Sequence, residues 1–220
     1  MKKISLLFFL LITACTVSPE KVSILDRSDC TLPCWNGIVA GQTTENDLLS
    51  ILESLPSVNQ QSIQVTNETW NIFDNQVYFS FQQDGTQSQQ MEGEVRISKK
   101  TVSDFIICGE IHTTIGELIQ QIGAPEKIIS GNNFYGGRTM ILINTKKGVA
   151  YWYTADLKNL EITSTTFVQC IKIFDVSLYD AMLDAKFFSN GYYNAEETRK
   201  VWYPWDGYGN LDEKYPPRQP

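Results

Sequence analysis

Residues 111–125 read IHTTIGELIQQIGAP, and residues 37–56 read GIVAGQTTENDLLSILESLP. In each stretch a Thr-Thr pair is followed by an acid three residues after its second threonine, the signature of a capping box at a helix start. Apolar residues then recur at helical spacing until a proline ends the run. We therefore predict two short helices, capped by Thr44 and Thr114, each with one apolar face that needs a sheet to cover it.

Segments rich in β-branched and aromatic residues follow both predicted helices, and Gly-containing turns separate them. The predicted strands are 69–73, 77–81, 94–98 and 102–108 in the first half, and 139–144, 149–154 and 162–174 in the second. A helix followed by antiparallel strands, found twice, predicts the α+β class rather than alternating βαβ units.

The simplest organisation is two tandem helix-plus-antiparallel-sheet units. They span residues 30–109 and 110–175, and residues 176–220 form a C-terminal helical and aromatic extension. Coincidence is the alternative, because threonine-capped helices are common.

The motif Thr-x-x-Glu-Leu-Ile-x-x-Ile-Gly-x-Pro-x-x-Ile at residues 114–128 resembles the SmpA/OmlA type of outer-membrane-assembly lipoprotein. It is also similar to the wider superfamily shared with β-lactamase inhibitor protein. The resemblance covers roughly residues 34–175 and implies a helical pair packed on an antiparallel sheet, in tandem in the inhibitor protein. The first copy lacks the Gly-x-Pro ending, and the cysteines are not part of the family's pattern. Because its members bind proteins in different ways, the resemblance implies a fold and no particular partner.

The first residues have the parts of a secretory signal: a basic start, a short apolar run from Ile4 to Ile12, and a small residue before the cut. The run is too short to span about 30 Å of hydrocarbon, which takes roughly 20 residues. Ile12-Thr-Ala-Cys15 resembles the lipobox of bacterial lipoproteins, which implies cleavage after residue 14 and lipid attachment to Cys15.

We therefore expect a signal peptide at 1–14, a lipidated tether at 15–29, and a location in the cell envelope on the extracytoplasmic side of a membrane. The alternative is an ordinary signal peptide with a cysteine after Ala14. Inner and outer membrane are not distinguished.

Cleavage after residue 14 removes Lys2 and Lys3 from 18 basic residues and leaves 16 against 25 acidic ones, a net charge of −9. This charge disfavours nucleic acid and anionic lipid head groups as partners. The four remaining cysteines are Cys30, Cys34, Cys108 and Cys170. An even number in an exported chain predicts disulfides, with three pairings open. Free thiols, or a metal site that uses the first two cysteines, are the alternatives.

No catalytic motif is evident in the sequence, and His112 is the only histidine. Acid pairs such as Asp180/Asp184 and Glu196/Glu197 would in principle suit a glycosidase, although exposed helix faces explain them more simply. We predict no catalytic residue, no metal and no cofactor.

Clustered aromatic residues mark the C-terminal extension: Trp202, Tyr203, Trp205 and Tyr208. They are interpreted either as a latch that packs back on the domain or as a stacking platform for a sugar or peptide. The predicted function is that of a non-catalytic protein-binding or scaffold module. The alternative is a carbohydrate-binding or carbohydrate-active envelope protein, and the oligomeric state stays open.

Overall fold

The structure is a computed structural model that describes residues 30–67, 72–82, 91–132, 137–156, 159–185, 188 and 195–217. The predicted signal peptide at 1–14 and the tether at 15–29, with Cys15, lie outside these residues. None of the described helices combines the length and the hydrophobicity needed to span a bilayer.

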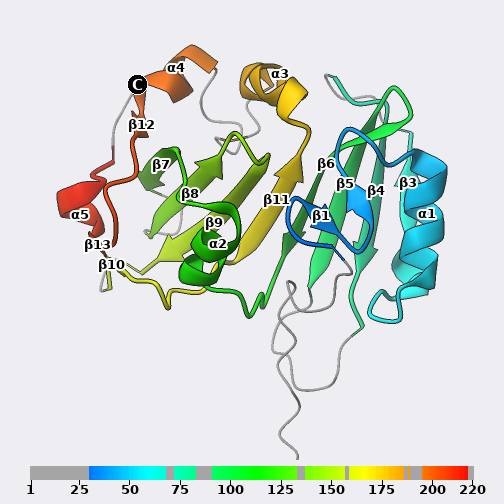
Figure 1. Cartoon of the computed structure of the whole chain (residues 1–220), viewed down its shortest axis with the longest axis horizontal. Helices are drawn as coiled ribbons and strands as arrows, with labels where there is room; N and C mark the ends of the chain where they lie inside the picture. The colour runs from blue at the N-terminus through cyan, green and yellow to red at the C-terminus, as the bar shows by residue number, and fades with distance from the viewer. Residues whose placement is uncertain are drawn as a thin grey trace, which may run out of the picture.

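An antiparallel sheet of nine strands, in the order β12-β7-β8-β9-β11-β6-β5-β4-β3, runs through the described chain (Figure 1). Its strands are β3 (Gln64–Thr66), β4 (Asn75–Ser80), β5 (Glu92–Ser98), β6 (Thr101–Cys108), β7 (Lys127–Asn132), β8 (Arg138–Asn144), β9 (Val149–Ala155), β11 (Cys170–Phe174) and β12 (Trp202–Tyr203). Two short ladders accompany it: β1 (Cys34–Trp35) with β2 (Ile38–Val39), and β10 (Glu161–Ile162) with β13 (Gly209–Asn210).

The described helices are α1 (Glu45–Ser54), α2 (Ile115–Ile122), α3 (Tyr179–Asp184), α4 (Ala195–Lys200) and α5 (Leu211–Lys214), with 3₁₀ turns η1 (Gln60–Ser62) and η2 (Val176–Leu178). Helices together with a large antiparallel sheet confirm the predicted α+β class.

Both predicted threonine caps are present. The Thr114 hydroxyl accepts from the backbone N–H of Glu117, and the Glu117 carboxylate accepts from the N–H of Thr114, so this capping box is complete. In α1 the Thr44 hydroxyl accepts from the N–H of Asp47, while the Asp47 carboxylate binds the Thr44 hydroxyl. In the C-terminal extension, α3 begins differently, because Asp175 caps η2 and α3 starts without a side-chain cap.

Most predicted strands are confirmed within a few residues, and one prediction needs correction. The strand predicted at 162–174 is interrupted: β10 ends at Ile162, and β11 begins at Cys170. Strands β3, β7 and β12 of the sheet were not predicted, because β3 and β12 are only three and two residues long, and β7 follows a proline and ends in Gly-Asn. The strand predicted at 69–73 lies mostly outside the described residues.

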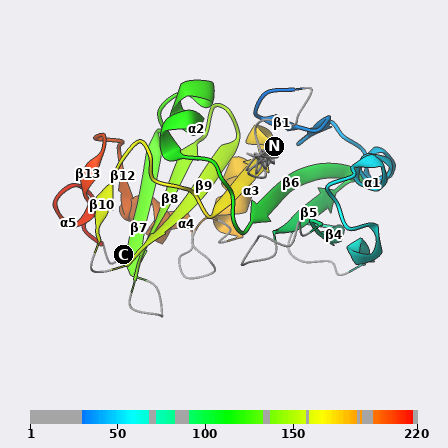
Figure 2. The same ribbon diagram turned by 90° about the horizontal axis from the view of Figure 1, so that it is seen from below.

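Two layers pack on the sheet. On one side, which we call the covered face, α1, α2 and the β1–β2 hairpin bury an apolar core that includes Leu48, Leu118 and Phe105 (Figure 2). On the opposite side, α3 and α4 cover β7, β8, β9 and β11, where Met182 packs in a second core with Ile141. No described helix contributes to a core over β3, β4 and β5 on this second side, and we call that region the open face.

The C-terminal residues are built into this architecture. β12 pairs with β7 at one edge of the sheet, and β13 pairs with β10. The described residues between 176 and 217 thus add a strand to the sheet and cover part of its second side.

The four cysteines of the described chain form two disulfides, Cys30–Cys34 and Cys108–Cys170, which confirms the prediction of disulfide bonds and selects one of the three pairings. Cys108 and Cys170 lie directly opposite each other on β6 and β11. This second disulfide joins the strands that follow α1 to those that follow α2.

Candidate functional site

The four C-terminal aromatic residues do not share one surface. Neighbouring residues of a strand point to opposite faces, so Trp202, opposite Ile129, lies in the core under α3 and α4, whereas Tyr203 lies in the core of the covered face. Lys127 Nζ lies 3.9 Å from the centroid of the Trp202 ring. Trp202 is therefore separated by the sheet from the other three aromatics.

Tyr203, Trp205 and Tyr208 gather instead around Tyr215. The Trp205 ring stacks on Tyr215 at 6.1 Å and meets Tyr208 edge-on at 5.4 Å. The Tyr215 hydroxyl accepts from the N–H of Asp206 and donates to the carbonyl of Gly207. These contacts tie the C-terminal segment to itself and to the core, the arrangement that the latch interpretation describes.

Two of the acids singled out in the sequence form ion pairs, and the histidine contacts an aromatic ring. Asp180 pairs with Arg199 at 3.3 Å, and Glu196 pairs with Lys200 at 2.9 Å along α4. His112 meets the exposed ring of Phe167 edge-on at 6.4 Å. Among the described residues, no group of three or more potential metal-binding side chains occurs.

The open face contains a hollow. Its volume is about 420 Å³, within the range of ligand-binding pockets. Four strands supply the lining: Ser62 and Gln64 at the β3 end, Tyr78, Phe79 and Ser80 on β4, Glu92, Gly93 and Glu94 on β5, and Ile106 and Cys108 on β6. We call this hollow the groove.

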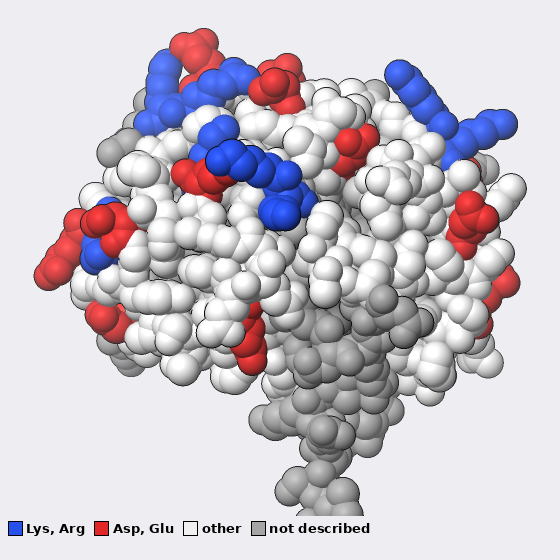
Figure 3. All heavy atoms as spheres, in the orientation of Figure 1, with Lys and Arg blue, Asp and Glu red and all other residues white. Residues whose placement is uncertain are grey.

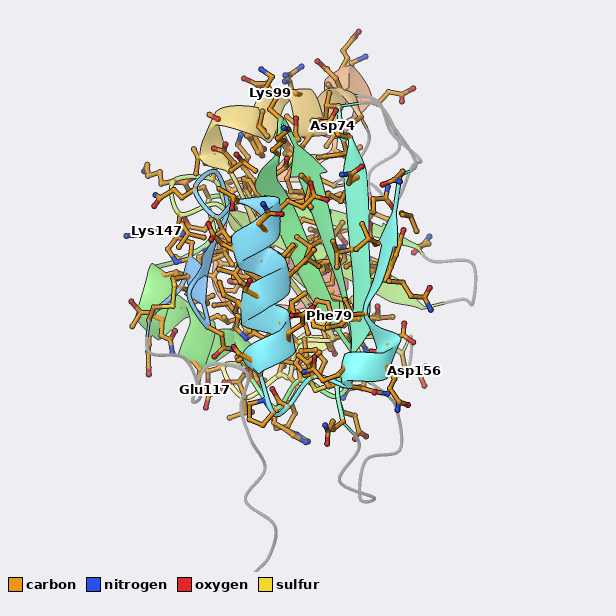
Figure 4. The ribbon with its side chains drawn as sticks, turned by 90° about the vertical axis from the view of Figure 1, so that its right-hand side faces the viewer. Asp74, Phe79, Lys99, Glu117, Lys147 and Asp156 are labelled. Carbon is orange, nitrogen blue, oxygen red and sulfur yellow. A yellow bond between two sulfur atoms is a disulfide. The ribbon has the colours of Figure 1, made fainter. Side chains whose placement is uncertain are left out.

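Strand register explains why these side chains meet. Ser80, Glu92 and Cys108 are successive partners across β4, β5 and β6, and Tyr78, Glu94 and Ile106 form the next row on the same face. The residues between them, such as Phe79 and Val95, point into the core of the covered face. Figure 4 views this half of the sheet from its β3 edge, with α1 on the covered face.

Glu92 is the free carboxylate of the groove. It is exposed, and no hydrogen bond or ion pair joins it to another described residue. Glu94 is partly buried and receives a bond of 2.7 Å from Arg96 Nε on one of its oxygens. Beside Glu92, Ser80 is only 6% exposed, and its buried hydroxyl oxygen has no hydrogen-bond partner in the described structure. A buried polar atom without a partner is uncommon in a folded protein.

A buried chain of charges leads from the groove toward the second core. Arg96 Nη1 lies 3.0 Å from Asp104 Oδ1, and the same oxygen lies 3.6 Å from Lys172 Nζ on β11. Lys172 is 2% exposed, and burial lowers its pKa to about 8, although the negative charge of Asp104 acts in the opposite direction. The network holds Arg96 in place, and Arg96 in turn fixes Glu94 at the groove.

A second hollow lies on the covered face. It has a volume of about 60 Å³ and is lined by the Cys30–Cys34 loop, by Trp35 and Gln121, and by apolar residues of β6 and β11. Its size suits one or two water molecules rather than an organic ligand. Figure 3 shows this side of the molecule, on which Lys and Arg gather mostly over the upper half and Asp and Glu are scattered.

Sequence reasoning missed the groove, although one signal for it was present. In β5 the polar residues Glu92, Glu94 and Arg96 alternate with Gly93 and Val95, the pattern of a strand with one polar face. The sequence does not reveal which strands flank β5, so the pattern alone could not place these carboxylates beside Ser80 and Tyr78.

No protein-family model, curated protein or solved structure matches this chain.

Proposed function

We propose that the protein is a lipid-anchored module of the cell envelope that binds a protein partner and catalyses no reaction. In this proposal the lipid is attached to Cys15, and the folded body lies on the extracytoplasmic side of a membrane, joined to the lipid by the tether at 15–29. The lipobox-like Ile12-Thr-Ala-Cys15 supports the anchor.

The binding part of the proposal rests on the unequal way in which the described helices cover the two sides of the sheet. The covered face is filled with apolar side chains, and α3 and α4 close half of the second side, whereas the open face exposes Gln64, Tyr78 and Glu92. An exposed tyrosine surrounded by hydrogen-bonding groups is typical of the surfaces with which proteins bind one another. The acids Glu94 and Asp104 are engaged by Arg96, which favours a structural rather than a catalytic role for them.

We also infer that residues 30–109 and 110–175 are tandem units of the kind found in the superfamily of β-lactamase inhibitor protein. Each helix is followed by four strands that pair in sequence order, except that β10 leaves the sheet between β9 and β11. The two capping threonines support the inference: Thr44 forms a bridge to Thr101 at the start of β6, and Thr114 forms one to Phe167 just before β11. These final strands, β6 and β11, pair antiparallel at the centre of the sheet.

Site-specific photocrosslinking in intact cells tests the binding face. A benzophenone amino acid replaces Tyr78 on the open face or, as the matched control, Tyr208 in the C-terminal aromatic cluster; both tyrosines are exposed at about 36–38%. Protein adducts from position 78 and few from position 208 are expected. Adducts only from position 208 would reject the open face as the binding surface.

The carbohydrate alternative is tested separately. Trp205→Ala is compared with the unaltered protein on a glycan array and in a cell-wall pull-down. Glycan binding that disappears in the variant, without protein adducts at position 78, would replace the proposal with that alternative.

The anchor has its own test. Mass spectrometry of the mature N-terminus should find acyl chains on Cys15, and both Cys15→Ser and globomycin treatment should abolish them. An unlipidated mature N-terminus in untreated cells would reject the anchor.

A further inference from the structure

We propose that the groove on the open face binds a cationic segment of the partner, with a lysine or arginine side chain placed between Glu92, Glu94 and Ser80. The inference rests on the proposed function, because it specifies what that same face recognises. Three features of the groove support it: its charge, an unpartnered polar atom and its apolar strip.

The charge of the groove is negative on the side that faces solvent. Glu92 and Glu94 are two residues apart on β5, so their side chains project from the same face about 7 Å apart. Arg96 compensates Glu94 and is itself shared with the buried Asp104, and no described cation compensates Glu92. A cation that enters the groove therefore meets one uncompensated carboxylate and part of a second.

Ser80 supplies the independent observation. Its hydroxyl is buried at the base of the groove, directly opposite Glu92 in the strand register, and has no hydrogen-bond partner among the described residues. A hydroxyl oxygen accepts hydrogen bonds, and an ammonium or guanidinium group carries several donors. A ligand cation held by Glu92 would give the Ser80 oxygen the partner that it lacks.

The remaining lining suits the rest of such a side chain. Ile106 is partly buried and Tyr78 is 38% exposed, and both lie in the row next to Ser80 and Glu92. The methylene groups of lysine and arginine pack readily on apolar and aromatic surfaces while the charged end stays in polar surroundings. An anionic ligand would meet two carboxylates, and a neutral sugar would leave the charge of Glu92 unused.

A peptide titration tests the proposal. The probe is a fluorescein-labelled heptapeptide, Gly-Ala-Lys-Ala-Lys-Ala-Gly, and binding to the full chain is followed by fluorescence anisotropy at low and at physiological salt. Binding that weakens as salt rises is expected, because an ion pair open to solvent is screened. The same peptide with both lysines acetylated should bind at least fivefold more weakly.

Glu92→Gln, which removes the charge and keeps the shape, should weaken binding of the lysine peptide about three- to fivefold. The matched control is Glu161→Gln, an exposed acid on β10 outside the groove, which should bind like the unaltered protein. Circular dichroism confirms that both variants are folded.

Three results would overturn the proposal: no binding of the lysine peptide up to 1 mM, equal binding of the acetylated peptide, or equal effects of the two substitutions. Binding of chitotetraose that Glu92→Gln weakens would assign the groove to glycans instead. Sequencing of the partner segment crosslinked at position 78 distinguishes a failure of the cationic-ligand proposal from a failure of the protein-binding function. A neutral or acidic segment would leave the protein-binding function standing and refute the cationic ligand.

Discussion

Replacing Lys172 by methionine should remove a large part of the pH dependence of the protein's stability. The Lys172 ammonium group is buried between strands, 3.6 Å from Asp104, with the rings of Trp152 and Phe188 at 5.6 and 5.9 Å. Burial lowers its pKa from 10.5 to about 8. The unfolded chain keeps this proton up to about pH 10.5, whereas the folded protein releases it above about pH 8.

The sign of the effect follows from proton binding. Between about pH 8 and 10.5 the unfolded state holds more protons than the folded state, so the free energy of unfolding rises with pH. With these two pKa values, the contribution of Lys172 to that rise between pH 7 and 9.5 is roughly 2 kcal/mol. Methionine does not titrate, so Lys172→Met should lack this part of the rise. Asp104 keeps its bond to Arg96 in the variant.

The measurement is urea-induced unfolding followed by far-UV circular dichroism at several pH values from 7 to 9.5. The pH series ends at 9.5 because burial raises the pKa of Tyr151. This raised pKa makes the free energy of unfolding fall at higher pH in every variant. Lys147→Met serves as the control, because this lysine is exposed and its substitution leaves Lys172 in place. If the Lys172→Met protein gained stability with pH as steeply as the unaltered protein, the assignment of the buried charge would be refuted.

Three further perturbations probe the fold. Gly93→Ala should destabilise the protein by about 1–3 kcal/mol, because a Cβ there would lie 2.1 Å from an aromatic ring on β4, while Gly131→Ala, with nothing within 4 Å, serves as its control in the same thermal melt. Replacing Cys108 and Cys170 together by alanine should cost about 4 kcal/mol, since the bond spans 62 residues; an unchanged urea midpoint would show that the bond does not constrain the unfolded chain. Thr114→Ala should cost about 1 kcal/mol through loss of the capping box, and a serine at that position should restore most of it.

Local interactions explain why the helices could be read from the sequence. The cap of α2 involves residues only three positions apart, and its apolar face follows from the spacing of Leu118 and Ile122. The same reasoning predicted β5, β6, β8 and β9, because each contains β-branched or aromatic residues. β3 carries too few residues for such a pattern, and β7 follows a proline and ends in Gly-Asn, so both were missed.

The candidate site depends on distant pairings. Ser80, Glu92 and Cys108 belong to one row only because of the register between β4, β5 and β6, and a shift by one residue would turn each of them toward the other face. Lys172 reaches Asp104 across a separation in sequence of 68 residues, and no local pattern encodes that contact.

The sequence by itself determined the α+β class, the two capped helices and the presence of disulfide bonds, because composition and short-range spacing decide these properties. Only the tertiary structure decided which cysteines pair, which half of the sheet the described helices leave uncovered on its second side, and that Glu92 of β5 lies opposite Ser80. These features follow from the order and register of the strands. Order and register are set by the packing of whole elements, so residues far apart in the chain fix them together.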